Sequence, residues 1–193
     1  VATDDKRIQK ICSKNGINSI ITSKKCLTGT DRIAEVAKKI KKKFYINVQG
    51  DEPICNPKDI KKILNFAIKN PNLIVNGYTE IKDKELFYSP NIPKVVFDKN
   101  EWLLYMSRAP IPSNKKQTFI KSWRQVCIYS FPYKYLKIYT SIKKKTKLEL
   151  IEDLESNRFL ELGYKIKMLK MSNKSVAVDT KEDLLKVRKL VKN

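Results

Sequence analysis

Residues 30–68, TDRIAEVAKKIKKKFYINVQGDEPICNPKDIKKILNFAI, contain the patterns of a helix, a strand, an acidic loop and a second helix, in that order. Between Ile33 and Ile40, apolar residues follow the i, i+3, i+4, i+7 spacing of one helix face. The run from Phe44 to Val48 is short and apolar, which is typical of a buried strand, and Pro57 suits the first turn of the next helix. This order predicts an α/β fold.

The same alternation continues on both sides of this stretch. Further strands are expected at residues 1–3, 19–22, 73–78, 123–129, 165–169 and 176–178, and further helices ending near residue 15, over 148–162 and towards the C-terminus. A hairpin at residues 94–106 and several prolines interrupt the rhythm. We therefore expect one domain over residues 1–193, with a mostly parallel sheet and an inserted arm at residues 86–147.

Composition excludes several classes of protein. Hydrophobic residues make up 41% of the 193 residues, which is typical of a globular domain. No apolar run approaches the roughly 20 residues of a membrane helix, so we expect no membrane association. The absence of histidine excludes histidine bases and histidine metal sites. Four widely spaced cysteines without a CxxC pair favour reduced thiols in a cytoplasmic protein.

The formal charge of +21 raises the question of nucleic-acid binding. Lysines outnumber arginines by 35 to 6, and most lie on expected helix faces. No helix-turn-helix, zinc-finger or RNP-like motif is present. We therefore expect no nucleic-acid partner, while polyanion binding stays as an alternative hypothesis. The charge weakly favours small ligands that carry phosphate.

Two acidic loops are candidate metal ligands. In the first, Asp51 follows an apolar strand and Gly50, which places it at the edge of the sheet where ligands of open α/β folds bind. A carboxylate there suits magnesium whose other ligands are phosphate oxygens. In the second loop, Asp179 also follows an apolar run. The alternatives are that Asp51 caps a turn or a helix, and that Asp179 or Thr180 caps the following helix.

Two further motifs are candidate ligand sites. Thr28, Gly29 and Thr30 form a turn before a helix, whose first amides can hold a nucleotide phosphate. Arg108 stands between an expected strand and a proline-stiffened loop, and its planar guanidinium suits a carboxylate. Turns of this kind are common, and a surface arginine is the alternative for Arg108.

Six segments, taken in order, resemble one family over essentially the whole chain: the 3-deoxy-manno-octulosonate cytidylyltransferases, or CMP-Kdo synthetases. The NVQGDEP and SRAPIP motifs are the most specific of the six. The segments are VATDD (1–5), TSKKCLTGTDRIAEV (22–36), NVQGDEP (47–53), PNIPKVVFD (90–98), YMSRAPIP (105–112) and VDTKEDLLKVR (178–188).

The resemblance implies a reaction and a fold. CTP and the sugar acid Kdo, a 2-keto-3-deoxy acid, would give CMP-Kdo and pyrophosphate with magnesium, for synthesis of lipopolysaccharide or another surface polysaccharide. The fold would be a three-layer α/β/α Rossmann-like nucleotidyltransferase. Its inserted hairpin arm, residues 86–147, would form a homodimer.

The resemblance also implies roles for individual residues. Asp51 and Asp179 would hold magnesium and, with Arg108, carry the catalytic work. The nucleotide would lie along Gln49, Arg32, Thr30 and Gly29, and the sugar acid would contact Arg108, Gln125, Tyr129, Glu155 and Ser156.

The chain departs from the family pattern at several places. The family's first strand and its Arg- and Lys-containing phosphate loop would precede Val1, so an N-terminally truncated form is expected. Cys26 and Gln125 stand where the family usually has histidine, and Cys127 and Ser156 replace Gly and Gln. The alternatives are therefore a cytidylyltransferase for another nonulosonic acid, or a non-catalytic nucleotide-binding remnant.

Overall fold

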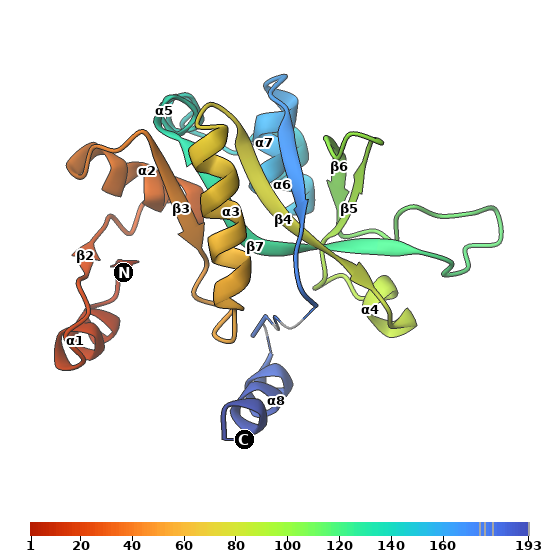
Figure 1. Ribbon diagram of the computed structural model, residues 1–193, viewed down its shortest axis with the longest axis horizontal. Coiled ribbons are helices and arrows are strands. Elements are labelled where there is room, and N and C mark those ends of the chain that lie inside the picture. The colour runs from red at the N-terminus through yellow and green to blue at the C-terminus, as the bar shows by residue number, and fades with distance from the viewer. Residues whose placement is uncertain (174, 176, 179, 193) are drawn as a thin grey trace.

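A six-stranded sheet organises the protein, whose computed structural model describes residues 1–173, 175, 177, 178 and 180–192 (Figure 1). The strand order is β6-β5-β7-β4-β8, and β3 also pairs with β7. The six strands are β3 (Phe44–Val48), β4 (Ile74–Ile81), β5 (Lys94–Phe97), β6 (Leu103–Ser107), β7 (Ser122–Pro132) and β8 (Ile166–Lys170). A separate parallel pair joins β1 (Ala2–Thr3) to β2 (Ile20–Ile21).

The sheet is mixed, and most of its strands share one direction. Strands β3, β4 and β5 are each antiparallel to β7, and β8 is parallel to β4. Four strands therefore run one way, while β7 and β6 run the other way. The predicted α/β class and the shared strand direction are confirmed. The sequence did not predict that β7 lies between β3 and β4 and runs antiparallel to both.

Helices begin where the sequence supplies capping residues. Thr28 accepts a hydrogen bond from the amide of Asp31, and Asn56 accepts one from the amide of Lys58 with Pro57 at the start of its helix. The helices are α1 (Lys6–Lys14), α2 (Gly29–Lys39), α3 (Pro57–Lys69), α4 (Lys84–Tyr88), α5 (Tyr133–Ser141), α6 (Lys147–Glu152), α7 (Ser156–Glu161) and α8 (Lys181–Lys192).

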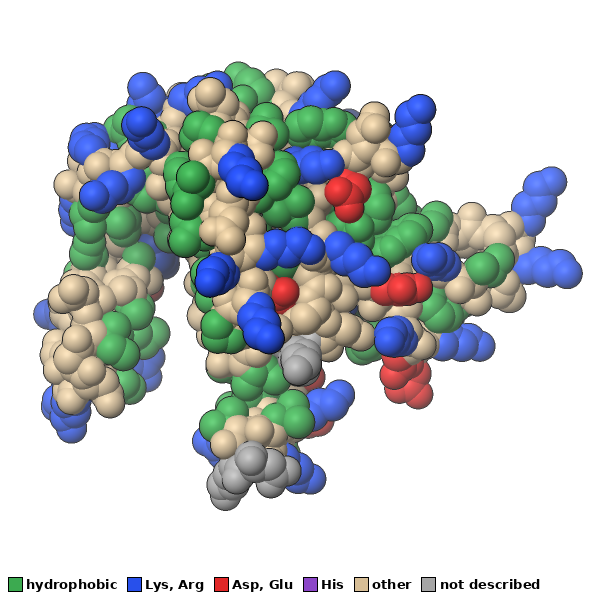
Figure 2. Space-filling view, viewed as in Figure 1, with side chains coloured by type: hydrophobic (Ala, Val, Ile, Leu, Met, Phe, Trp, Pro, Cys, Tyr) green, Lys and Arg blue, Asp and Glu red, His purple; other side chains and the backbone are tan. Residues whose placement is uncertain are grey.

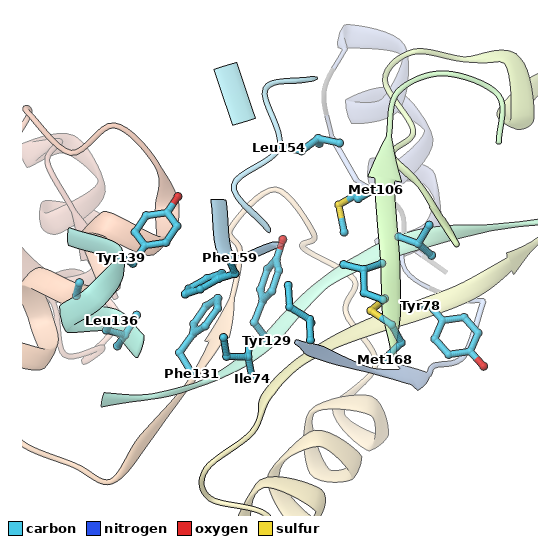
Figure 3. Packing of buried hydrophobic residues seen from close by; sticks show 14 of the residues in the cluster. Ile74, Tyr78, Met106, Tyr129, Phe131, Leu136, Tyr139, Leu154, Phe159 and Met168 are labelled. Atoms are coloured by element: carbon cyan, nitrogen blue, oxygen red, sulfur yellow. The ribbon is translucent and has the colours of Figure 1, made fainter. Parts of the chain in front are cut away.

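Apolar side chains fill both faces of the sheet and give three layers. On one face, Ile63 of α3 packs with Val126 and Ile128 of β7. On the other face, residues of α2, α5 and α7 pack on Tyr129 and Phe131, and Phe131 stacks on Phe159 with ring centroids 5.7 Å apart (Figure 3). Because alternate residues of β7 point to opposite faces, one strand contributes to both layers.

The prediction of one helix over residues 148–162 is wrong, because the chain forms two short helices there, α6 and α7. Asp153 between them adopts a left-handed conformation with φ 50° and ψ 46°, which ends α6. Helix α5 was not expected at all. The strand expected at 176–178 is not formed at residues 177 and 178, and residue 176 lies outside the described part of the chain.

Residues 86–147, expected as an inserted arm, do not lie apart from the sheet throughout. Strand β7 pairs with β3 and β4 at the centre of the sheet, and α5 packs against α2. Hairpin β5–β6 continues the sheet at one edge. The role of this segment in dimer formation stays a prediction.

Positive charge is dispersed over the face of the molecule that Figure 2 shows. Figure 2 shows lysine and arginine side chains spread over the visible face, among apolar and uncharged groups. In the described part of the chain, no helix has both the length and the apolar character needed to cross a membrane.

Candidate active site

A cavity of about 410 Å³ opens beyond the end of β3. Its wall is built from the loops after β2 and β3, from β7, from the loop after β6 and from the turn between α6 and α7. Six of the residues that the resemblance assigns to the metal, the nucleotide or the sugar acid line it together: Gln49, Asp51, Arg108, Gln125, Tyr129 and Glu155. Segments more than 100 residues apart in the chain therefore meet here, at the sheet edge expected from the strand order.

A second hollow, of about 420 Å³, shares Gln49 and Asp51 with the first. Gly29 and Arg32 line this hollow. Gly29 and Arg32, expected along the nucleotide, thus line one hollow, most residues expected around the sugar acid line the other, and Gln49 and Asp51 border both. Of the other expected residues, Thr30 is completely buried and Ser156, at the start of α7, is buried as well, and neither residue lines one of the two hollows.

Glu155 joins the glycine turn to the end of β3. The backbone amide of Thr30 donates to its Oε2 at 2.9 Å, and Gln49 Nε2 donates to its Oε1 at 2.7 Å. A Cβ atom at Gly29 would lie only 3.1 Å from Gln49 Nε2, so glycine allows this close approach. Burial raises the pKa of Glu155, although the bonds from Thr30 act in the opposite direction. The left-handed turn at Asp153, just before Glu155, allows the chain to place this carboxylate behind the glycine turn.

The second acidic loop lies directly against the first. The backbone amide of Val178 donates to the carbonyl of Asp51 at 2.8 Å. The Ser175 hydroxyl donates to Glu52 Oε2, and Glu52 Oε1 accepts from the backbone amide of Cys127 at 2.7 Å. Asp179 itself lies outside the described residues. Its neighbour Val178 nevertheless places this loop beside Asp51.

Near Asp51 the structure describes one carboxylate that borders both hollows, and not a complete set of metal ligands. Among the residues that the structure describes, no three acidic, histidine or cysteine side chains are grouped to hold a metal ion. Magnesium is usually held by one or two carboxylates, with phosphates and water completing its octahedron. Asp51, at the border of both hollows, provides a carboxylate of that kind.

Arg108 is fixed by backbone carbonyls. Its Nε donates to the carbonyl of Glu152 at 2.7 Å, Nη1 to Pro90 at 2.9 Å and Nη2 to Asp153 at 3.3 Å. A guanidinium has five N–H groups, so two of them are left after these three bonds. Arg108 lines the cavity, and its remaining N–H groups can bind a carboxylate there.

Lys94 is a buried cation beside Arg108. Its Nζ donates to the carbonyl of Ser89 at 2.8 Å and to that of Arg108 at 2.5 Å, and its side chain is completely buried. Burial and, secondarily, the charge of Arg108 lower the pKa of Lys94 from 10.5 to about 8. A neutral amine has two N–H groups, which match these two carbonyls.

This environment predicts a pH-dependent stability. Between about pH 8 and pH 10.5 the folded protein releases the Lys94 proton while the unfolded chain keeps it, so folding becomes more favourable as pH rises. We expect the difference in unfolding free energy between the parent protein and Lys94→Met, measured with urea, to change in favour of the parent between about pH 8 and pH 10.5, because the raised pKa values of buried thiols and phenols affect both proteins alike. Lys61→Met, at an exposed position, is the control and should follow the parent. Parallel pH profiles for the parent and Lys94→Met would contradict the assignment.

Several residues of this region were not found from the sequence. Glu52 and Arg124 line the cavity, and Arg124 Nη2 donates to the carbonyl of Ser175 at 2.7 Å. Burial lowers the pKa of Arg124, while Glu52 opposes the shift. The sequence signal that could have identified Glu52 was its position next to Asp51. The signal for Lys94 was the presence of a lysine within an apolar strand pattern.

Three comparisons with known proteins agree. The cytidylyltransferase family matches residues 1–167. A 3-deoxy-manno-octulosonate cytidylyltransferase of Trichlorobacter lovleyi is 37% identical, and the alignment covers all of this chain and 81% of that protein. The mitochondrial enzyme of the same name from Arabidopsis thaliana is 34% identical, with all of this chain and 68% of that protein covered.

A solved structure shows the same similarity in three dimensions. It is a CMP:2-keto-3-deoxy-manno-octonic acid synthetase complexed with CTP. The TM-score is 0.90 at 32% sequence identity, over all of this chain and 79% of that one.

Proposed function

The chain belongs to the 3-deoxy-manno-octulosonate cytidylyltransferase family, and from this we propose that it transfers the cytidylyl group of CTP to a 2-keto-3-deoxy sugar acid of the Kdo type. The products are the CMP-sugar and pyrophosphate. The observation that carries the proposal is the match, over the whole chain, to a synthetase that was solved with CTP. The two hollows that meet at Gln49 and Asp51 support it, because the reaction joins two substrates.

The reaction replaces a phosphoanhydride bond of CTP with a phosphate ester bond to the sugar acid. The anomeric hydroxyl of the sugar acid attacks the α-phosphorus of CTP, the bond to the β-phosphate breaks, and pyrophosphate leaves with that electron pair. The hydroxyl proton passes to solvent water in the same step. The protein must therefore hold two anionic substrates in line and stabilise charge on the phosphate oxygens.

Each part of the site has a role in this proposal. Gln49 and the turn containing Gly29 hold the nucleotide in the second hollow. The two remaining N–H groups of Arg108 bind the carboxylate of the sugar acid. Asp51 and Asp179 would hold magnesium, which would supply positive charge at the phosphates and lower the pKa of the attacking hydroxyl.

The setting of the reaction is part of the proposal. The four cysteines are free thiols, which fits the reducing cytoplasm. We assign the product to synthesis of lipopolysaccharide or another surface polysaccharide, and the hairpin region within residues 86–147 to the contact of a homodimer.

Pyrophosphate release tests the proposal. The protein is incubated with CTP, magnesium and, in turn, Kdo and other 2-keto-3-deoxy acids, including nonulosonic acids. We expect release that depends on both CTP and one of these acids, with one CMP-sugar formed per pyrophosphate. Release with a nonulosonic acid but not with Kdo would change the substrate and keep the chemistry. No release with any of them would refute the proposal.

A further inference from the structure

Three buried polar side chains form a row at one wall of the cavity. Gln125 and Tyr129 of β7 line the cavity, and Asn76 of β4 lies behind them with no exposed surface. Asn76 is paired with Tyr129 across the two strands, beside an irregularity in the register at Gly77. Buried polar groups of this kind need hydrogen-bond partners, and their partners determine how they are oriented.

The orientation of the Asn76 amide follows from its neighbours. One end of this amide lies 3.0 Å from the carbonyl of Val126 and 3.1 Å from the carbonyl of Ile128. Backbone carbonyls only accept hydrogen bonds, so the amide nitrogen must face them. Both N–H groups of Asn76 are then used, and its oxygen faces Gln125.

The same reasoning orients Gln125. Because the Asn76 oxygen only accepts, Gln125 must present its nitrogen, and the two atoms are 3.1 Å apart. That nitrogen also lies 2.8 Å from the Tyr129 hydroxyl. Burial raises the pKa of Tyr129 well above its usual value, so the hydroxyl is a neutral group that can accept this bond.

Gln125 is thus left with an acceptor only. Its two N–H groups are used by Asn76 and Tyr129, and within the described part of the chain no group donates to its Oε1. A glutamine without such neighbours can rotate its amide and serve as donor or acceptor. The hydrogen bond to the Asn76 oxygen prevents this rotation.

We propose that Asn76 fixes Gln125 as a hydrogen-bond acceptor in the cavity wall, so that the sugar acid must place a hydroxyl or an amine against it. The inference rests on the proposed function and narrows its substrate. A carbonyl, ether or carboxylate oxygen at that position would face another acceptor, and both would lose their bonds to water without replacement. Gln125 therefore determines specificity, and Asn76 is a positioning residue.

Substrate analogues test this directly. The probe set is the sugar acid that gives the highest turnover, together with its analogues in which each hydroxyl in turn is replaced by hydrogen or by a methoxy group. For the parent protein we expect one position at which both replacements lower kcat/KM about 10- to 100-fold. Replacement of that hydroxyl by an amine should preserve turnover.

Gln125→Met is the decisive variant, because methionine has nearly the same length and offers no comparable acceptor. Gln125→Met should lower kcat/KM for the full substrate by the same factor, about 10- to 100-fold. Its kcat/KM should then be the same for the full substrate and for the analogue that lacks the critical hydroxyl. Gln117→Met, at an exposed glutamine outside the cavity, is the matched control and should keep the parent discrimination. Asn76→Leu should also weaken the discrimination, because Gln125 can then rotate.

The possible outcomes distinguish a failure of this inference about Gln125 from a failure of the proposed cytidylyl transfer. Unchanged discrimination in Gln125→Met, or full turnover of a methoxy analogue at every position, would overturn this inference and leave the cytidylyl transfer intact. No turnover with any sugar acid would overturn the proposed function, and this inference with it. If Asn76→Leu does not fold, the result for Gln125→Met decides the question alone.

Discussion

Asp51→Asn is expected to lower kcat by about a thousandfold while the fold stays intact. Asp51 lies at the border of both hollows, where the proposed reaction needs a metal-binding carboxylate. Asparagine keeps the size of the side chain and removes its charge. A metal ion supplies several kcal/mol of transition-state stabilisation, and about 4 kcal/mol corresponds to a thousandfold change in rate. Steady-state pyrophosphate release measures the change, and circular dichroism checks the fold.

Asp83→Asn is the matched control for this variant. Asp83 accepts the amide of Glu85 at the start of α4 and does not line either hollow. Asparagine caps a helix about as well as aspartate, so neither activity nor stability should change. A rate for Asp51→Asn within a fewfold of the parent rate would remove Asp51 from the proposed metal site.

Arg158→Met is expected to lower the free energy of unfolding by about 3–5 kcal/mol, the usual cost of leaving one member of a buried ion pair without its partner. Arg158 and Glu149 are both completely buried, with Nε–Oε2 2.6 Å and Nη2–Oε1 2.7 Å apart. The guanidinium also lies 3.7 Å from the centre of the Tyr139 ring. Without it, the Glu149 carboxylate stays buried with only weaker partners. Urea denaturation measures the loss.

Two further variants make this prediction specific. Adding Glu149→Leu to Arg158→Met should recover part of the lost stability, because no unpaired charge then remains inside. Arg7→Met removes an exposed pair with Asp5 and should leave the stability unchanged. Equal effects of Arg7→Met and Arg158→Met would show that burial does not determine the contribution of these pairs.

The sequence predicts local structure well where one short pattern decides it. The strand at Phe44–Val48 has the expected bounds, and α3 begins at Pro57 as expected. Asp51 and Gln49 lie in the cavity because the loop after an apolar strand of the sheet emerges at the sheet edge. These features depend on residues that are neighbours in the chain, so they can be predicted from one sequence.

Features that depend on distant residues could not be predicted in the same way. The insertion of β7 between β3 and β4 joins segments about 40 to 90 residues apart, which no local pattern encodes. The pattern over residues 148–162 continues without a break, yet the chain turns at Asp153. Glu155 lines the cavity in which the sugar acid is expected, but the bonds that its oxygens accept from Thr30 and Gln49 could not be predicted, because they depend on side-chain orientation.

The location of a divalent cation in crystals grown with CTP is the most direct test of the proposed chemistry. Manganese replaces magnesium, and its anomalous scattering gives its position. The expected result is a peak within about 2.0–2.5 Å of the Asp51 carboxylate, with Asp179 as a second ligand and the triphosphate beside it. A peak remote from Asp51, or CTP bound outside the two hollows that share Gln49 and Asp51, would contradict it.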